Sequence, residues 1–505
     1  MFARLAKASD LVERLDAEYF TPDFIQADAQ IAAASTRFGS MNTLEDIRDP
    51  STGLCYGVLQ PEFASSGIPA IEMRDMADGM LYLPELRIPG WQHKEYIRSA
   101  VIPGDLLITV KGTLGRIAIA PEWFPEANVN RDIARLRIKK GSCDVHYLFA
   151  FLSAKPGYLS LQRIIRGTIQ RNLNIGDLLE HEVLLPSNDA QHYIGAKARQ
   201  ADRLRTLATI ANESISRLVA SPLLTAAMST PSLRCGITQV TDLEPRLDGK
   251  FYNNRAIAVL RAARTEYTPI RNLIEDISNG FEHREFCENG SIYLTVTEVS
   301  SGRLDAITAP HIPAEIKIPE KAIINERCVL VVRTGSVGVA VKVYPDDVGM
   351  AISSHLIRLQ CASEQVAASI AAFLNGDAGK VLLNKISYGA VQPQIGQDEL
   401  LSLPVPKHII DAGPEICTLM TEQEKALRSS QQLIQAAKLL VEALIEGTIT
   451  EADLLVAAAD PAADRALLAR LTRAGLDVAD STPLFPDAAA LDALVADTHA
   501  QQGKP

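Results

Sequence analysis

Two stretches of the chain carry apolar or small residues at alternating steps of three and four. The first follows Pro186 and has these residues at Ala201, Leu204, Ala208, Ala211, Ile215 and Leu218. The second has the same steps at Ile416, Met420, Gln423, Leu427, Ser430, Ile434, Ala437, Val441 and Leu444. This spacing is the seam of a helix that packs lengthwise on another, and Pro222 and Gly447 are suited to end the helices. We expect two long helices that pair with each other; the alternative is that each packs on the segment before it.

The segments before the two helices repeat each other at an offset of 223 residues, which becomes 222 after one gap. The matched glycines are Gly57 and Gly280, Gly67 and Gly290, Gly79 and Gly302, Gly112 and Gly335, Gly115 and Gly338, Gly157 and Gly379, and Gly167 and Gly389. Further matches are Glu62-Phe63 with Glu285-Phe286, Arg135-Leu136 with Arg358-Leu359, Phe151-Leu152 with Phe373-Leu374, and Gln170 with Gln392. Chance would match roughly half a glycine pair over such a span, so the chain contains an internal duplication.

Strand-like runs lie between the matched glycines. They are Leu106 to Val110 and Ile117 to Ala120 in the first copy, and Val329 to Val332 and Val339 to Val343 in the second. Each copy is therefore predicted to be a turn-rich α+β module. A tail rich in Ala, Leu and Asp follows, with helical patterns around 463–474 and 488–496. The expected domains are two modules at 1–187 and 223–410, two helices at 188–222 and 411–447, and an acidic extension at 448–505.

The composition indicates a protein that folds in water. Of 505 residues, 47% are hydrophobic and 22% are charged, which is ordinary for a globular chain. No apolar run reaches the roughly 18 residues of a membrane span, and the first ten residues lack the apolar core of a signal peptide. We therefore expect the protein in the cytoplasm. The seven cysteines stand singly, which argues against a zinc site or a disulfide framework.

The charge is unevenly distributed. The net charge of −11 argues mildly against nucleic acid as a partner. However, the tail from Gly447 has nine acids and four bases, whereas Arg131 to Arg171 has nine bases and two acids. A basic segment in the first module is thus compatible with a polyanionic ligand.

Two short motifs occur in the same order in both copies. A turn after a strand reads Lys111-Gly112-Thr113-Leu114-Gly115 in the first and Thr334-Gly335-Ser336-Val337-Gly338 in the second. A Gly-x-x-Gln segment reads Gly167-Thr168-Ile169-Gln170 and Gly389-Ala390-Val391-Gln392, and an apolar strand ending at Pro186 or Pro406 follows. With these motifs, the duplication and the heptad helices, residues 10–447 resemble the specificity subunits of type I restriction–modification enzymes.

The resemblance implies an α+β fold with two repeated target-recognition domains separated by two long antiparallel coiled-coil helices. Each module would read one half of a split site in double-stranded DNA, and the helices would set the spacing and bind two methyltransferase subunits. S-adenosylmethionine is expected in those partners and no cofactor in this chain; a restriction or translocase subunit can join. A helix from Ala190 to Ala220 would be about 45 Å long. Module centres would then lie roughly 13 base pairs apart, with an unread gap of roughly five to eight. The acidic tail departs from the family's usual ending.

The candidate DNA contacts are cations, amides and hydroxyls in and near the repeated motifs. Arg and Lys neutralise phosphates, and Arg, Asn and Gln also pair with purine edges. In the first module the candidates are Lys111, Thr113, Arg116, Asn130, Arg131, Arg163, Arg166, Gln170, Arg171 and Asn172. In the second, less basic set they are Arg333, Thr334, Ser336, Ser354, His355, Lys385, Tyr388, Gln392 and Gln394. The alternative for both sets is a solvated polar face without a ligand.

No catalytic centre is predicted in this chain. It lacks an Asn/Asp-Pro-Pro-aromatic motif and a Gly-rich cofactor loop, and the stretch from Gly376 to Lys380 departs from a phosphate-binding loop. Asp305, Glu315 and Lys317 have the spacing of some metal-dependent nucleases, but the first module does not repeat them. A stand-alone nuclease is one alternative function. A scaffold whose modules bind protein is another, which the negative net charge favours.

Overall fold

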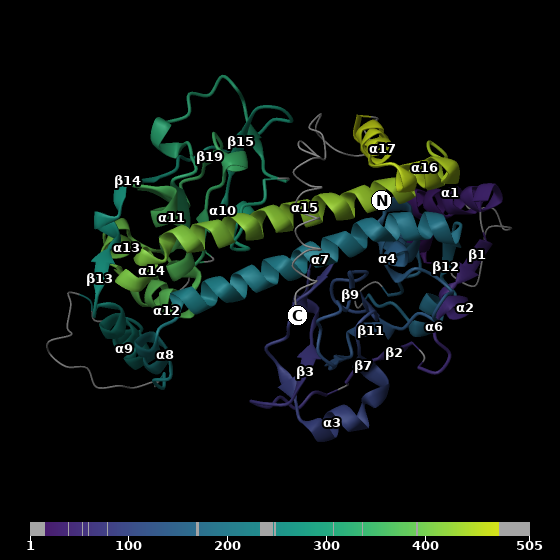
Figure 1. The fold of residues 1–505 in the computed structure, drawn as a ribbon, viewed down its shortest axis with the longest axis horizontal. Helices are drawn as coiled ribbons and strands as arrows, with labels where there is room; N and C mark the ends of the chain where they lie inside the picture. Colours follow the sequence, from purple (N-terminus) through teal and green to yellow (C-terminus); the bar gives the residue numbers. More distant parts are fainter. Residues whose placement is uncertain are drawn as a thin grey trace. The chain divides into compact units, whose positions relative to one another are not determined.

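The computed structural model describes residues 16–38, 40–52, 54–58, 60–77, 79–167, 171–232, 246, 249–306, 308–335, 337–389 and 392–473. Its ribbon is drawn in Figure 1. The chain divides into two compact units. Unit 1 comprises Met1–Leu207 and Ala426–Pro505, and unit 2 comprises Ala208–Lys425.

Unit 1 contains two four-stranded sheets and a strand pair. The sheets have the strand orders β2-β11-β8-β9 and β6-β3-β10-β7, and β1 pairs with β12. The strands are β1 (Ser40–Thr43), β2 (Cys55–Tyr56), β3 (Ile68–Ile71), β6 (Arg87–Ile88), β7 (Ala100–Val101), β8 (Leu106–Thr109), β9 (Ile117–Ile119), β10 (Ala127–Val129), β11 (Ile133–Leu136) and β12 (Glu182–Leu185), with a hairpin of β4 (Met76–Ala77) and β5 (Met80–Leu81). The helices before α7 are α1 (Pro22–Phe38), α2 (Leu44–Ile47), α3 (Gly90–Glu95), α4 (Val145–Ser153), α5 (Lys155–Arg163) and α6 (Ile175–Leu179).

Unit 2 repeats this arrangement with one strand fewer in its second sheet. Its sheets have the orders β14-β20-β17-β18 and β16-β15-β19, and β13 pairs with β21. The strands are β13 (Tyr267–Pro269), β14 (Ile274–Asn279), β15 (Ser291–Leu294), β16 (His311–Ile312), β17 (Cys328–Val332), β18 (Ala340–Lys342), β19 (Ala351–Ile352), β20 (Leu356–Cys361) and β21 (Pro404–Pro406). The helices are α8 (Pro222–Met228), α9 (Asn254–Ala263), α10 (Val296–Val299), α11 (Glu364–Asn375), α12 (Asp377–Ile386), α13 (Gln397–Leu401) and α14 (Lys407–Asp411).

The matched glycines mark places where backbones meet. A Cβ added at Gly57 would lie 1.8 Å from the carbonyl oxygen of Val129, and one at Gly280 would lie 2.0 Å from that of Ile352. The two glycines lie at equivalent places in the two units, because the parallel strand pair β3–β10 of unit 1 corresponds to the pair β15–β19 of unit 2. The α+β class and the duplication predicted from the glycine spacing are confirmed. Only glycine permits such approaches, which explains why the repeat is most visible at glycines.

The two predicted long helices are present as α7 (Asn188–Val219, 32 residues) and α15 (Gly413–Glu446, 34 residues) (Figure 1). At 1.5 Å per residue they are about 48 and 51 Å long. Helix α7 runs from unit 1 into unit 2, and α15 returns from unit 2 to unit 1. In unit 2, Ile215 and Val219 of α7 share a core cluster with Ile416 of α15. The end of one helix thus packs near the start of the other, as antiparallel helices require.

Most positions of the two predicted helix seams are buried, whereas Leu218, Met420, Gln423 and Leu427 are half-buried. Ala201, Leu204, Ala208, Ala211 and Ile215 of α7 are all buried. On α15 the last turns are buried around most of the helix: Leu433, Ile434, Ala436, Ala437, Leu439, Leu440, Val441, Ala443, Leu444 and Ile445. A helix that is apolar on all sides is surrounded by other elements. The heptad pattern predicted burial along only one side of the helix, whereas the C-terminal end of α15 is buried on most sides within unit 1.

Elements from both ends of the described chain hold that end of α15. The Arg37 guanidinium of α1 donates to the carbonyl oxygens of Leu444 and Ile445. Two further helices, α16 (Glu451–Ala459) and α17 (Pro461–Arg473), follow α15. Asp464 of α17 accepts hydrogen bonds of 2.5 Å from Tyr193 and Lys197 of α7. The first helical pattern of the tail is thus present to Arg473, and the second, around 488–496, lies outside the described residues.

In the described part of the chain, no single helix combines the length and apolar character needed to cross a membrane. Only α11 and α12 taken together reach that length and composition, across a bend of 78°. Both helices contribute many buried side chains to the core of unit 2, among them Phe373, Leu374, Leu382 and Leu383.

Candidate nucleic-acid interface

Three loops of unit 1 meet at Val110, directly after β8. The Val110 amide donates to the Asp132 carbonyl at 2.8 Å, and the Val110 carbonyl accepts from the Leu173 amide at 3.0 Å. Arg166 and Asn172 exchange backbone hydrogen bonds of 2.9 and 2.8 Å. These bonds bring together the described residues of 110–116, 130–132 and 166–173, which we name loop cluster 1. These candidate residues lie in three separate stretches of the sequence, and the fold makes the stretches neighbours.

Unit 2 builds the same arrangement around Arg333, the counterpart of Val110. The Arg333 amide donates to the His355 carbonyl at 2.9 Å, and its carbonyl accepts from Ile395 at 3.0 Å. Tyr388 and Gln394 exchange backbone hydrogen bonds of 2.9 and 2.8 Å. We name the described residues of 333–338, 353–355 and 388–395 loop cluster 2. Gln170 of the first candidate set and Ser336 of the second lie outside the described residues.

The turn of loop cluster 1 is held by Thr109. Its hydroxyl donates to the Thr113 carbonyl at 2.5 Å and accepts from the Arg116 amide at 2.9 Å. Gly112 and Gly115 have φ angles of +68° and +76°, a region that favours glycine. Lys111, Thr113 and Arg116 are consequently exposed on a fixed turn.

The cations of loop cluster 1 differ in how they are paired. Lys111, Arg116, Arg131 and Arg171 are exposed. Arg131 lies 3.8 Å from Asp132 and Arg171 lies 3.7 Å from Glu18, distances at which an exposed ion pair contributes little. By contrast, Arg166 donates twice to Asp177, at 2.6 and 2.5 Å. Asp177 therefore neutralises Arg166, while the other four cations form an exposed basic surface.

Two candidate cations belong to the interiors of their units. Arg163 donates to the Tyr19 carbonyl at 3.1 Å, bonds to Asp28, and lies 4.1 Å from the centre of the Tyr19 ring. Lys385 is 5% exposed, donates to the Phe251 carbonyl at 2.8 Å and sits 3.0 Å from the Phe251 ring centre. Both side chains hold helices in place, and neither presents its charge to solvent as the exposed cations do.

Loop cluster 2 is polar rather than basic. Ser354 donates its hydroxyl to Glu282 at 2.8 Å, and Arg284 donates to the same carboxylate at 2.9 Å. The Ser354 hydrogen bond, with that of Arg284, holds the pKa of Glu282 below its usual value. No sequence pattern singles out Glu282, because Ser354 is 72 residues away.

The remaining candidates differ in exposure. His355, Tyr388 and Gln392 are exposed, Arg333 and Gln394 are half-buried, and Thr334 is buried. Asn130 and Asn172 in loop cluster 1 are half-buried, and the Asn130 amide oxygen accepts from the Asp132 amide at 3.0 Å.

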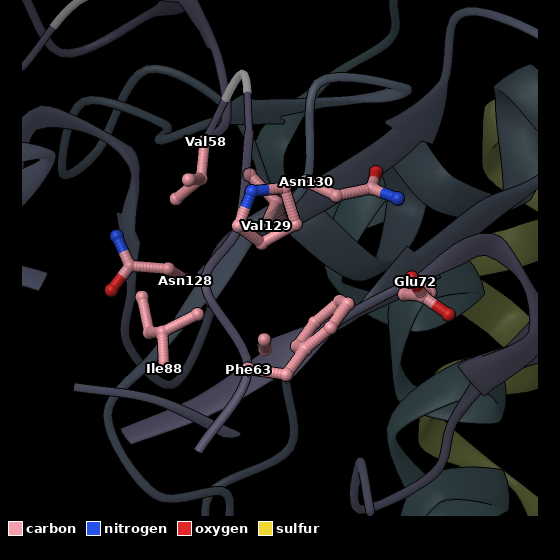
Figure 2. Close-up of a pocket in the computed structure, with 9 residues that line it drawn as sticks. Val58, Phe63, Glu72, Ile88, Asn128, Val129 and Asn130 are labelled. Atoms are coloured by element: carbon pink, nitrogen blue, oxygen red, sulfur yellow. The ribbon is translucent and has the colours of Figure 1, made fainter. Parts of the chain in front are cut away.

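A small hollow adjoins loop cluster 1 (Figure 2). It is lined by Val58, Pro61, Phe63, Ala70, Glu72, Ile88, Asn128, Val129 and Asn130. Asn130 thus belongs both to the hollow and to loop cluster 1. The sequence pointed to Phe63 only as half of the repeated Glu-Phe pair, without a role.

The residues of the nuclease alternative lie outside both loop clusters. Asp305, Glu315 and Lys317 are exposed in the connection between α10 and the short helix at Glu320–Ala322. Among the residues that the structure describes, no group of three or more His, Cys, Asp or Glu side chains could hold a metal ion.

A known protein shares sequence with this chain. Over 163 residues, the chain is 32% identical to the type I restriction enzyme EcoBI specificity subunit of Escherichia coli. The chain resembles type I specificity subunits. The match covers 32% of this chain and 34% of that relative, so it spans about a third of the relative's length. No protein-family model matches the chain.

Solved structures of such subunits are also similar. The type I restriction–modification S subunit from M. genitalium matches with a TM-score of 0.41 and 13% identity, over 81% of this chain and 95% of that one. The HsdS subunit from Thermoanaerobacter tengcongensis matches with a TM-score of 0.28 and 14% identity, over 81% of this chain and 97% of that one.

Proposed function

We propose that the chain is a non-catalytic specificity subunit that reads a bipartite DNA target. The observation that carries the proposal is the duplicated loop cluster. Each unit brings polar side chains from three loops together around one backbone position, and a duplicated reader suits a target with two half-sites. The sequence shared with a type I specificity subunit supports the same role.

The chemistry of the two clusters suits DNA in different ways. Lys111, Arg116, Arg131 and Arg171 give unit 1 a surface for phosphates. Unit 2 offers Gln392, Gln394 and Tyr388, which suit contacts to base edges and sugars more than charge neutralisation. The net charge of −11 arises elsewhere, notably in the tail, and does not oppose a local basic surface.

In this proposal the chain acts through partners in the cytoplasm. Two methyltransferase subunits bind the outer faces of α7 and α15 and supply the S-adenosylmethionine chemistry. A restriction or translocase subunit joins the same complex in a phage-defence system. The unread gap between half-sites scales with the length of α7 and α15, so inserting four residues at matched points in both helices should lengthen the gap and leave both half-sites unchanged.

The deciding experiment is methylome sequencing of a host that carries this chain with its neighbouring methyltransferase. The expected result is methylation at two short specific sequences separated by a fixed unread gap. A continuous recognition sequence would refute the two-reader proposal. In vitro, the absence of salt-dependent duplex binding would favour the protein scaffold, because phosphate contacts impose a steep salt slope. Loss of restriction in a Glu315→Ala complex with intact assembly and methylation would favour the nuclease.

A further inference from the structure

The surface that the hollow beside loop cluster 1 exposes comes from apolar atoms. Val58, Ala70 and Ile88 are 2%, 5% and 0% exposed and form one hydrophobic cluster. In Figure 2 the Phe63 ring and the side chains of Val58 and Ile88 face the same space. Asn128 also borders the hollow, but its amide nitrogen already donates to Tyr96 and Ser99. The space is about the size of one water molecule or one methyl group.

Unit 2 fills the corresponding place with aromatic rings. The strand registers pair Ala70 with Asn128 in unit 1 and Tyr293 with Ala351 in unit 2. Tyr293 therefore stands where unit 1 has Ala70. Its ring meets Phe281 edge to face at 5.4 Å, and its hydroxyl donates to the Phe281 carbonyl at 2.6 Å. In the described part of unit 2, the Tyr293 and Phe281 rings thus occupy the place that Ala70 borders in unit 1.

An exposed phenylalanine is kept at this place in both copies. Phe63 is 50% exposed and Phe286, its partner in the repeated Glu-Phe pair, is 52% exposed. Phe286 rests on Tyr293, with ring centres 6.1 Å apart. Phe63 instead borders the hollow. Phe286 therefore covers the Tyr293 ring in unit 2, whereas Phe63, at the equivalent position, borders the open hollow in unit 1.

We propose that the hollow of unit 1 binds the C5 methyl group of a thymine in the first half-site. This inference rests on the proposed function. Thymine presents its methyl group and its O4 acceptor side by side in the major groove. The apolar lining of the hollow suits the methyl group. Unit 2, whose hollow is filled by Tyr293, makes no such contact with its half-site.

The test uses the full chain and duplexes of its mapped target in which each thymine is replaced, one at a time, by deoxyuridine. This change removes only the methyl group. Burying one methyl group contributes enough to change affinity about fourfold. One position should therefore show about fourfold weaker binding, and 5-bromodeoxyuridine, which is similar in size to thymine, should restore it. A half-site without thymine, or a flat scan, would overturn the proposal while leaving the bipartite target intact.

Two substitutions locate the contact. Ala70→Val fills the hollow, and Phe63→Ala removes one wall at an exposed position where folding is not at risk. Each should abolish the difference between thymine and deoxyuridine without weakening the deoxyuridine duplex. Phe286→Ala is the matched control, because it removes the same exposed ring in unit 2, and it should leave the fourfold difference unchanged. A difference that survives Phe63→Ala, or is lost in Phe286→Ala, would refute the assignment.

Discussion

The exposed cations of loop cluster 1 should determine how strongly DNA binding depends on salt. The perturbation is the double substitution Lys111→Ala and Arg116→Ala. Both residues are exposed on the turn that Thr109 fixes. The turn itself should persist, because the Thr109 bonds that fix it go to backbone groups of residues 113 and 116; the fold loses only the hydrogen bond of 3.2 Å that Arg116 donates to the Met76 carbonyl.

The magnitude follows from the number of cations. Lys111, Arg116, Arg131 and Arg171 are exposed, whereas Asp177 neutralises Arg166. Each phosphate contact contributes about −0.9 to the slope of log affinity against log salt, so four contacts give about −3.6. Binding through unit 1 should then weaken about 150-fold between 50 and 200 mM salt. With two cations removed, the slope should fall to about −1.8 and the same change of salt should weaken binding only about 12-fold.

The assay is fluorescence anisotropy of a labelled target duplex, titrated at four or more salt concentrations. The matched control is the double variant Arg271→Ala and Lys407→Ala, which removes two exposed cations outside both loop clusters. The control should keep the parent slope. If the Lys111 and Arg116 variant has the same salt slope as the parent protein, these cations do not contact phosphates. The assignment of loop cluster 1 as a DNA-binding surface would then be wrong.

Three further predictions concern stability and assembly. Arg163→Ala should lower the free energy of unfolding by about 2 kcal/mol, measured by urea denaturation, because it removes a charged hydrogen bond to Asp28; a stable variant with altered half-site recognition would show instead that Arg163 contacts DNA. Burial lowers the pKa of His181 from 6.5 to about 4. Only the unfolded chain therefore gains this proton as the pH falls, and stability should be full above pH 6.5 and drop by about 3 kcal/mol by pH 4. His181→Gln should flatten the acid limb of a pH-dependent denaturation series, and an unchanged limb would place its origin in other groups. Ile434→Glu puts a carboxylate at a site that is 7% exposed and should prevent isolation of a stable complex with the methyltransferase; a fully active complex would contradict the role of the α15 seam.

Local sequence patterns were enough to predict the two long helices and the duplicated modules. The steps of three and four along α7 and α15 reflect helix geometry, which acts between residues close in sequence. The duplication was visible because glycines such as Gly57 and Gly280 are required wherever two backbones meet closely. The repeated Arg135 and Arg358 are likewise structural, since both are buried and donate to backbone carbonyls, those of Arg98 and Ile323.

The roles of individual charged residues depended on partners far away in the chain. Lys385 and Lys111 are the same residue type in corresponding candidate sets, but Phe251 covers one ammonium group and the other is exposed. Arg163 is paired by Asp28, 135 residues away. A local sequence pattern cannot predict partners so far apart in the chain, because burial and ion pairing are decided only when the helices and strands pack together.

By itself, the sequence determined the α+β class, the duplication and the two long helices, because periodicity and glycine requirements are local. Only the tertiary structure decided that three separate loops meet at Val110, that the α17 residue Asp464 ties the tail to α7, and that Ala70 leaves open a space that Tyr293 fills in the other unit. Each of these depends on strand register and on side chains from distant segments. A one-residue change of register would bring different residues together at each place.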